Sequence, residues 1–411
     1  MQDILLNRSW AEVNLDNVAH NVKILREKVK RGAEIMGVVK ADAYGHGIRE
    51  IIPVLIENGV TRLAVSMLDE AIELRKNGVV IPILILSYTD PRRAKEIIEF
   101  NVTQTVYNKE LALSLSDAGK SLGKEVRIHI KVDTGMGRVG FMAGFDAIKT
   151  IEEIQKMPQI VIEGLYTHFA CADEENTDYT FKQFEQFMSI CNELGRIGIQ
   201  IPIKHVCNSA ATLRFPAMHL DMVRVGILLY GMSPSEVCNA RKQGFWQAMS
   251  LKTNVILVKD IDENQPISYG RIFTTKRASK IATIPIGYAD GYSRSLSNKS
   301  SVLLHERRYP VVGNICMDTC MIDVTEPIND DPVSAKLKCL SMNTSMNPVI
   351  TVGDEVVLFG KQGNAFLDID EIATLMNTIN YEVTCLVGKR VPRAYIRNNQ
   401  VVEIKNYLIG E

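Results

Sequence analysis

One lysine follows an apolar run, in a stretch whose residue types are suited to chemistry. Residues 35–39 are apolar apart from one glycine, Lys40 comes next, and Asp42, Tyr44 and His46 then alternate with alanine and glycine. A lysine at the end of a buried strand costs desolvation energy unless it is paired or reactive. Its amine could simply reach water, or it could be a desolvated amine that forms a Schiff base with a carbonyl compound.

Other residues with useful chemistry also stand at the ends of apolar runs. They are Lys131, Arg138, His168, His205, Asn208, Ser209 and Arg224. An arginine inside an apolar strand needs partners because it cannot lose its charge. Ser209 and the backbone N–H groups near Gly226 and Ile227 could hold a phosphate. A strand-end lysine, several cations and a phosphate seat together indicate pyridoxal phosphate, with the lysine carrying the cofactor.

The spacing of apolar runs predicts the elements that position these residues. Eight short apolar runs, most of them separated by a helical pattern, favour a (β/α)8 barrel. An open doubly wound sheet is the alternative. The runs are residues 35–39, 63–65, 82–88, 102–106, 126–132, 160–166, 203–207 and 222–229. Residues 135–140 match the GxGxxG pattern, but they follow the fifth strand, whereas a dinucleotide fingerprint opens the first unit of an open sheet.

The pattern changes from helical to strand-like at about residue 246. We predict a barrel over residues 14–245, a mainly β domain over residues 246–411, and a first strand within residues 1–13 that belongs to the β domain. Within the β domain we expect one strand over residues 253–258 and a helix at residues 372–376. The polar stretch at residues 328–348 is interpreted as a surface insertion.

Composition excludes several classes of protein. The chain has 411 residues, of which 46% are hydrophobic and 23% charged, and a formal net charge of −1. This balance is ordinary for a globular protein and gives no sign of a nucleic-acid or membrane partner. The eight cysteines form no CxxC pair, which favours reduced thiols over a zinc site or disulfides. We therefore expect a cytoplasmic protein without a metal.

Nine motifs carry a resemblance to a known family. They are VVKADAYGHG, KVDTGMGRVGF, YTHFA, CNSAA, MVRVGILLYG, ISYG, IGYADGY, NICMD and INYEV. In this order, over about residues 8–400, they resemble alanine racemase. The resemblance implies an isomerase that interconverts L-alanine and D-alanine through a pyridoxal phosphate aldimine, for cell-wall peptidoglycan. It also implies a head-to-tail homodimer with an N-terminal barrel and a C-terminal β domain.

The resemblance also implies a role for each site residue. Lys40 corresponds to the lysine that holds the cofactor, and Arg224, backed by His205, to the arginine at the pyridine nitrogen. Arg138 matches the arginine at the phenolic oxygen, and Lys131 the lysine that is carbamylated beside it in many members. Asn208 is grouped with the cofactor-binding residues. The positions that match the phosphate site are Tyr44, Ser209, Gly226, Ile227 and Tyr381.

A second set of implied roles lies in the β domain. Tyr269 matches the second catalytic base, which acts on the partner's site. Its neighbour in the hydrogen-bond network is His168 of the barrel, which is also grouped with the cofactor-binding residues. Met317 belongs to the seat of the substrate carboxylate together with Arg138, Asp318 lies beside it, and Tyr288 lies at the entrance.

The chemistry of racemisation agrees with these roles. A proton must leave one face of Cα and another must arrive at the opposite face, so two bases are needed, here Lys40 and Tyr269. Arginine cannot accept the pyridine proton, so the ring nitrogen should stay unprotonated and transamination should be limited. A carbamate on Lys131 would be an anion beside Arg138, whereas a bare ammonium would be a second cation.

Four alternatives remain open. A serine racemase or a broad-specificity racemase is possible, although Tyr381 favours alanine because serine-preferring relatives commonly replace it. Decarboxylases of the same barrel type usually put an acidic residue where Arg224 stands. Non-catalytic pyridoxal phosphate carriers lack the β domain and Tyr269.

Overall fold

The structure is a computed structural model that describes residues 8–328 and 348–410. The described chain divides into two compact units. One unit contains residues 17–246, and the other joins the described residues up to Asp16 to those from Gln247 onward. The predicted insertion at residues 328–348 falls almost entirely on residues 329–347, outside the described part.

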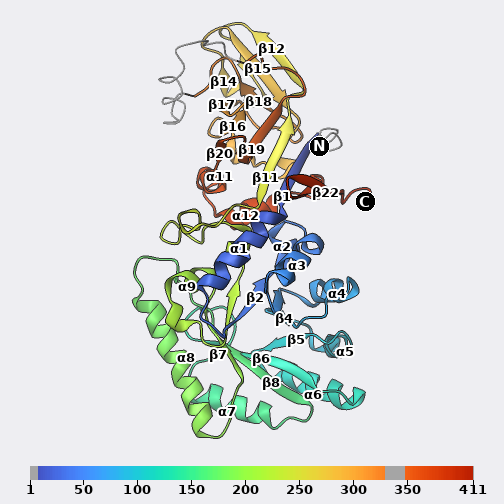
Figure 1. Cartoon of the computed structure of the whole chain (residues 1–411), viewed down its shortest axis with the longest axis vertical. Helices are drawn as coiled ribbons and strands as arrows, with labels where there is room; N and C mark the ends of the chain where they lie inside the picture. Colours follow the sequence, from blue (N-terminus) through green and yellow to red (C-terminus); the bar gives the residue numbers. More distant parts are fainter. Residues whose placement is uncertain (1–7, 329–347, 411) are drawn as a thin grey trace. The chain divides into compact units, whose positions relative to one another are not determined.

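The unit of residues 17–246 is a nearly closed barrel of eight parallel strands, with helices on the outside of the strands (Figure 1). The strands are β2 (Glu34–Val38), β3 (Arg62–Val65), β4 (Ile83–Ile85), β5 (Thr103–Val106), β6 (Val126–Asp133), β8 (Ile160–Tyr166), β9 (Ile203–His205) and β10 (Met222–Val225). Their order is β10-β2-β3-β4-β5-β6-β8-β9. Hydrogen bonds from Asp221 N–H to Lys204 O and from Arg224 N–H to Cys207 O connect the β9 and β10 segments (3.2 and 3.0 Å). The predicted barrel is confirmed.

Helices alternate with these strands because apolar residues recur at helical spacing between the apolar runs. The helices are α1 (Leu15–Lys28), α2 (Lys40–Tyr44), α3 (Ile48–Glu57), α4 (Leu68–Lys76), α5 (Ala94–Glu99), α6 (Lys109–Leu122), α7 (Phe145–Gln155), α8 (Asp178–Arg196) and α9 (Ser209–Arg214). Helix α6 shows how local sequence sets the limits. Asn108 Oδ1 accepts a hydrogen bond from Leu111 N–H (2.8 Å), and Gly123 ends the helix at φ 62°.

The last predicted strand of the barrel is too long. We expected one strand over residues 222–229, but β10 ends at Val225 and a 3-10 helix, Ile227–Tyr230, follows it. All four residues of that turn are buried, so the apolar run continues although the strand does not. Periodicity alone cannot separate a buried turn from a buried strand.

The other unit is built around an eleven-stranded, mostly antiparallel sheet. Its strands include β1 (Ser9–Asn14), β11 (Met249–Asn254), β12 (Leu257–Ile261), β15 (Ser279–Ile284), β16 (Ser301–Leu304), β17 (Arg307–Val312), β18 (Cys320–Asp323), β19 (Glu355–Gln362), β20 (Ala365–Leu367), β21 (Arg393–Arg397) and β22 (Gln400–Lys405). The order is β12-β15-β18-β17-β16-β19-β11-β1-β21-β22, and β20 pairs with β19. Strand β1 therefore lies between β11 and β21, antiparallel to the first and parallel to the second.

Two details of this unit differ from the sequence-based expectation. The strand expected over residues 253–258 is two strands, because β11 ends at Asn254 and β12 begins at Leu257. The expected helix at residues 372–376 is part of α11 (Ile369–Met376), and a further helix, α12 (Asn380–Leu386), was not predicted. A small hairpin of β13 (Pro266–Ile267) and β14 (Phe273–Thr274) brackets Tyr269.

The cysteines, the helices and the possible metal ligands of the described residues bear on the class of protein. Seven cysteines lie in this part of the chain, and all seven are free thiols. None of the helices in residues 8–328 and 348–410 is both long and apolar enough to cross a membrane. Within the same ranges no group of three or more His, Cys, Asp or Glu side chains is placed to hold a metal ion.

Candidate active site

Lys40 lies two residues after the last residue of β2, Val38, at the carboxyl end of that strand, where barrel enzymes place their chemistry. The backbone then turns left-handed, with φ of 54° at Ala41, Asp42, Ala43 and Tyr44. Each non-glycine residue in this conformation costs about 1–2 kcal/mol. Gly45 and Gly47 follow with φ of 80° and 92°, so four residues with side chains share the left-handed conformation with the two glycines. Such strain is concentrated at functional sites.

Hydrogen bonds hold this strained turn in place. Glu70 accepts from Ala41 N–H at Oε1 (2.6 Å) and from Ser66 N–H at Oε2 (2.7 Å), so it ties the turn to the end of β3. Asp42 Oδ1 accepts from Ile48 N–H (2.7 Å) at the start of α3. His46, fully buried, donates from Nδ1 to Ala43 O (2.9 Å). These hydrogen bonds fix the backbone of the turn that follows Lys40.

Three predicted phosphate-binding residues come together beside this turn. The Gly226 N–H donates to Ser209 Oγ (3.0 Å), and a Cβ on Gly226 would lie 2.5 Å from Tyr44 Oη. The close approach of the Tyr44 ring therefore requires glycine at position 226. Asn208 is used differently, because its Oδ1 accepts from Ala211 N–H (2.9 Å) at the start of α9. Two hydroxyl groups and a backbone N–H in this small space fit a phosphate group.

Arg224 is the centre of a buried polar cluster. Its side chain is on β10 and only 4% exposed. NH1 contacts His205 Nδ1 (3.0 Å) and donates to His205 O (2.9 Å). NH2 donates to Thr167 O (2.8 Å) and Val206 O (3.2 Å) and contacts His168 Nδ1 (3.2 Å). Its Nε–H makes no hydrogen bond to the described residues, so one donor is left for a ligand that can only accept.

Lys131 and Tyr166 lie beside that cluster. The Lys131 amine is 5.4 Å from the centre of the Tyr166 ring, and the Arg224 guanidinium is 5.0 Å from it. The Tyr166 ring stacks on His205 at 4.7 Å. Burial, aided by the positive charges of Arg224 and Arg138, lowers the pKa of Lys131 from 10.5 to about 7. An amine with that pKa is largely neutral, and therefore nucleophilic, at mildly alkaline pH.

The loop that carries Arg138 is organised by Asp133. One carboxylate oxygen of Asp133 accepts from the N–H groups of Gly135, Met136 and Gly137, and the other from that of Arg138. This explains the glycine-rich motif without a dinucleotide, because the loop wraps around a carboxylate. A Cβ on Gly140, at φ 138°, would lie 2.5 Å from Asp133 N.

Sequence reasoning missed three residues of this cluster: His129, Glu163 and Tyr166. His129 precedes Lys131 by two positions on β6, so the alternation of a strand puts both side chains on the same face. Glu163 and Tyr166 lie on β8, just before His168. A charged residue within that apolar strand was the available signal for Glu163.

In the β unit, three predicted residues lie on loops that are joined to one another. Tyr269 O accepts from Asn314 Nδ2 (2.7 Å), and the Tyr288 N–H donates to Cys316 O (3.1 Å), next to Met317. Tyr269 is 71% exposed, Met317 53% and Tyr288 43%. These side chains present an aromatic and apolar surface, which favours contact with another molecule.

The remaining predicted residues of the β unit have different surroundings. Asp318 Oδ1 accepts from Arg390 NH2 (2.7 Å), which ties the loop that follows Met317 to the segment before β21. Tyr381 is in the first turn of α12 and partly buried.

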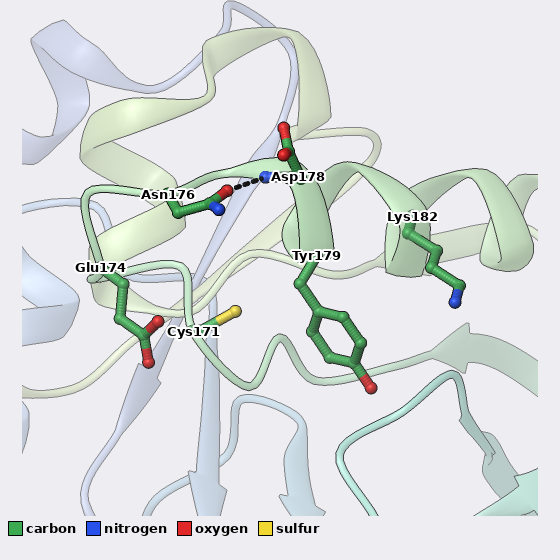
Figure 2. A pocket seen from close by; sticks show the side chains of 6 residues that line it. All are labelled: Cys171, Glu174, Asn176, Asp178, Tyr179 and Lys182. Carbon is green, nitrogen blue, oxygen red and sulfur yellow. Dashed lines mark hydrogen bonds between the residues drawn. The ribbon is translucent and has the colours of Figure 1, made fainter.

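A cavity of about 300 Å³ lies near the loops that follow β6 and β8. Figure 2 shows the side chains that line it: Cys171, Glu174, Asn176, Asp178, Tyr179 and Lys182. None of them is a predicted site residue. Tyr179 Oη donates to Gly135 O (2.9 Å), so this cavity borders the loop that carries Arg138.

The site as a whole fits pyridoxal phosphate. Lys40 offers an amine, the cluster around Gly226 offers polar groups for a phosphate, and Arg224 offers a donor to a ring nitrogen that carries no proton. The (β/α)8 barrel and the separate β unit add the frame of a two-domain enzyme.

Comparisons with known proteins agree. The family models "Alanine racemase, N-terminal domain" and "Alanine racemase, C-terminal domain" match residues 13–234 and 248–395. The alanine racemase of Clostridium tetani is 45% identical over 400 residues, covering 97% of this chain and 98% of the relative. That of Methanococcus maripaludis is 46% identical over 387 residues, covering 94% and 98%.

Solved structures give the same result. The alanine racemase of Clostridium difficile 630 has a TM-score of 0.89 at 39% identity, covering 98% of this chain and 99% of that one. The alanine racemase of Bacillus anthracis with bound L-Ala-P has a TM-score of 0.87 at 36% identity, covering 98% of each chain.

These matches place the chain in the class of barrel-type isomerases that act on amino acids. The chain belongs to the alanine racemase family, which confirms the family, the fold and the enzyme class that the sequence predicts. The roles of individual residues stay predictions.

Proposed function

We propose that the protein interconverts L-alanine and D-alanine with pyridoxal phosphate, and so supplies D-alanine for cell-wall peptidoglycan. It acts as a homodimer, in which the barrel of one subunit holds the cofactor and the β unit of the other supplies the second base. The proposal is supported by relatives named alanine racemase at 41–46% identity over nearly the whole chain.

Residues of the barrel hold the cofactor, together with Tyr381 of the β unit. Lys40 binds it covalently, Arg224 faces its ring nitrogen, and Arg138 faces its phenolic oxygen. Tyr44, Ser209, Gly226, Ile227 and Tyr381 bind the phosphate. When bound, pyridoxal phosphate withdraws electrons from Cα of the amino acid and makes its proton acidic.

Two bases move protons at Cα. Lys40 takes or gives a proton on one face, and the partner subunit's Tyr269 does so on the opposite face. Two bases on opposite faces invert the configuration, whereas one base would return the proton to the side it came from. Met317 and Arg138 hold the substrate carboxylate, and Tyr288 lines the entrance.

The observation that carries this proposal is the set of partners of Arg224. Among the described residues, every hydrogen bond of its guanidinium goes to a neutral acceptor and no carboxylate pairs with it. It keeps its protons, donates a hydrogen bond, and leaves the ring nitrogen unprotonated. Decarboxylases of this barrel type usually have an acidic residue there.

A direct test follows the stereochemistry over time. The purified protein, loaded with pyridoxal phosphate, is incubated with pure L-alanine, and both enantiomers are separated by chiral chromatography. We expect D-alanine to rise until the two are equal. A parallel incubation with L-serine tests specificity and should be much slower. Absence of D-alanine from a fully loaded protein would refute the proposal, and carbon dioxide release would indicate a decarboxylase.

A further inference from the structure

The buried charge of Arg224 has no adjacent counter-charge among the described residues. The salt bridges within the described residues do not include Arg224, although its side chain is only 4% exposed. Removing an ionised group from water without a partner is costly, and arginine cannot escape that cost by losing its proton. The environment must therefore compensate the charge through oriented dipoles or through a more distant carboxylate.

A line of hydrogen bonds connects Arg224 to such a carboxylate through two histidines. Arg224 NH1 contacts His205 Nδ1 (3.0 Å), and His205 Nε2 lies 2.8 Å from His129 Nδ1. His129 Nε2 lies 3.1 Å from Glu163 Oε2. The same oxygen of Glu163 accepts from Arg62 NH1 (3.1 Å). The four side chains of this Arg224–Glu163 line come from four strands, β10, β9, β6 and β8.

The side chains of the Arg224–Glu163 line are tightly packed, and most of them are buried. The two histidines are 0% and 1% exposed, and the Glu163 side chain is 17% exposed. A Cβ on Gly164, the residue that follows Glu163, would lie 2.4 Å from His129 Nδ1. Only glycine leaves the space that His129 occupies, because the contact is with a ring buried on all sides.

Only one arrangement of protons satisfies the whole line when both imidazoles are neutral. Arginine only donates, so His205 Nδ1 must accept, and the proton of His205 is on Nε2. His205 therefore donates to His129 Nδ1, and the proton of His129 is on Nε2, where it faces Glu163. Reversing either ring would place two N–H groups against each other.

The electrostatics agree with neutral rings and an ionised carboxylate. Burial, together with the charge of Arg224, lowers the pKa of both histidines, that of His205 well below its ordinary value. Burial alone would raise the pKa of Glu163, but the hydrogen bond from His129 and the charge of Arg62 outweigh it, and that pKa is lowered. Glu163 is thus the negative end of the line.

We propose that Glu163 and His129 are positioning residues that act on Arg224 through His205. The Glu163 carboxylate fixes the tautomer of His129, His129 fixes that of His205, and His205 then offers Arg224 an acceptor. This orients the guanidinium toward the ring nitrogen of the cofactor. The negative charge of Glu163 also compensates the positive charge of Arg224, although two imidazole rings lie between them. The inference rests on the proposed function, because it takes Arg224 to face that nitrogen.

Removing the carboxylate acceptor at Glu163 should allow both imidazole rings to change tautomer. With leucine there, His129 Nε2–H would have no acceptor, the ring could adopt its other tautomer, and His205 could turn an N–H toward Arg224. Glutamine should behave better, because its carbonyl oxygen can still accept from His129. Glu34→Leu is the matched control, since Glu34 accepts from Arg62 Nε (2.7 Å) but contacts neither histidine in the line.

The test reads the tautomers directly. Holoenzyme labelled with ¹⁵N-histidine is measured by solid-state NMR, and the signals of His129 and His205 are assigned by substituting each of them. We expect both rings to be neutral with the proton on Nε2 in the wild type, in Glu163→Gln and in Glu34→Leu. Glu163→Leu should show mixed tautomers. It should also lose about 10- to 100-fold in kcat with little change in KM, as expected for one charge-assisted hydrogen bond.

Two results would overturn the inference. A wild-type His205 that is doubly protonated, or that carries its proton on Nδ1, would reverse the line, and this measurement does not depend on whether any variant folds. Unchanged tautomers and unchanged kcat in Glu163→Leu would show that the carboxylate positions nothing. Failure of the proposed function itself is distinct, since the loaded wild type would then produce no D-alanine whatever its tautomers.

Discussion

The carboxylate of Asp133 accepts a hydrogen bond from the backbone N–H of Arg138, five residues further along the chain, at 3.1 Å. Three more N–H groups of the same loop point at the other carboxylate oxygen. One buried side chain therefore sets the path of the loop that presents Arg138.

Asp133→Ala should lower the free energy of unfolding by about 1–3 kcal/mol, because several N–H groups lose a charged acceptor. It should also raise KM for alanine, because Arg138 is no longer held. Urea unfolding and steady-state kinetics measure the two effects. Asp117→Ala, on the exposed face of α6, is the control and should change neither. A variant Asp133→Ala with wild-type KM would show that the loop holds its shape without the carboxylate.

Ala41→Gly should leave the protein as stable as the wild type or more stable, by up to about 1 kcal/mol, because φ of 54° costs alanine energy that glycine does not pay. Ala19→Gly, within the regular helix α1, should destabilise by about 1 kcal/mol. Thermal unfolding of the two variants shows whether each substitution raises or lowers the stability of the protein. Equal losses in both would mean that the segment after Lys40 is an ordinary right-handed turn.

Lys131 should form a carbamate at alkaline pH, because its pKa of about 7 leaves a neutral amine there. The amine nitrogen bonds to the carbon of carbon dioxide and releases one proton to solvent. With ¹³C-bicarbonate, a carbamate signal should appear in the ¹³C NMR spectrum above about pH 7 and fade below it. Lys131→Met should lack the signal. A wild-type spectrum identical to that of Lys131→Met at every pH would contradict the prediction.

The lowered pKa of Lys131 also predicts how the free energy of unfolding changes with pH in carbonate-free buffer. Between about pH 7 and the ordinary lysine pKa of 10.5, the unfolded chain binds a proton at Lys131 that the folded chain does not. The free energy of unfolding of the wild type should therefore rise with pH across this window, relative to that of Lys131→Met. A difference that stays constant would mean that Lys131 is charged in the folded protein.

How far the sequence predicts this molecule depends on the kind of information. The barrel is predictable because eight apolar runs alternate with amphipathic segments, and Lys40, Arg138 and Arg224 are predictable because cations are rare next to apolar strands. The left-handed turn that begins at Ala41 is not predictable, because neither alanine nor aspartate by itself indicates a positive φ. His129 and Glu163 were overlooked because their importance lies in pairings between strands, which spacing along one strand does not reveal.

The covalent role of Lys40 can be tested without turnover. Borohydride reduction of the wild type in the presence of pyridoxal phosphate should leave the cofactor attached to the protein after denaturation, with the added mass on the peptide that contains Lys40. Lys40→Ala should release all of it. Lys131→Met serves as the control for the buried lysine on β6 and should still be labelled. Full labelling of Lys40→Ala would assign the linkage elsewhere.

The division of the two bases between subunits is the central claim. Removing either base should greatly lower the rate of racemisation. Tyr269→Phe should keep the bound cofactor and slow turnover by about 10²- to 10⁴-fold, and Lys40→Ala should be inactive. In a dimer of one Lys40→Ala chain and one Tyr269→Phe chain, one site lacks both bases and the other has both.

Mixing the inactive Lys40→Ala with the slowed Tyr269→Phe under conditions of subunit exchange therefore tests the account most directly. The mixture should recover about a quarter of wild-type activity, since random exchange makes half of the dimers mixed and each has one intact site. Native mass spectrometry verifies the exchange. Mixed dimers that form but stay inactive would contradict the account, because both bases would then come from one chain or Tyr269 would not be a base.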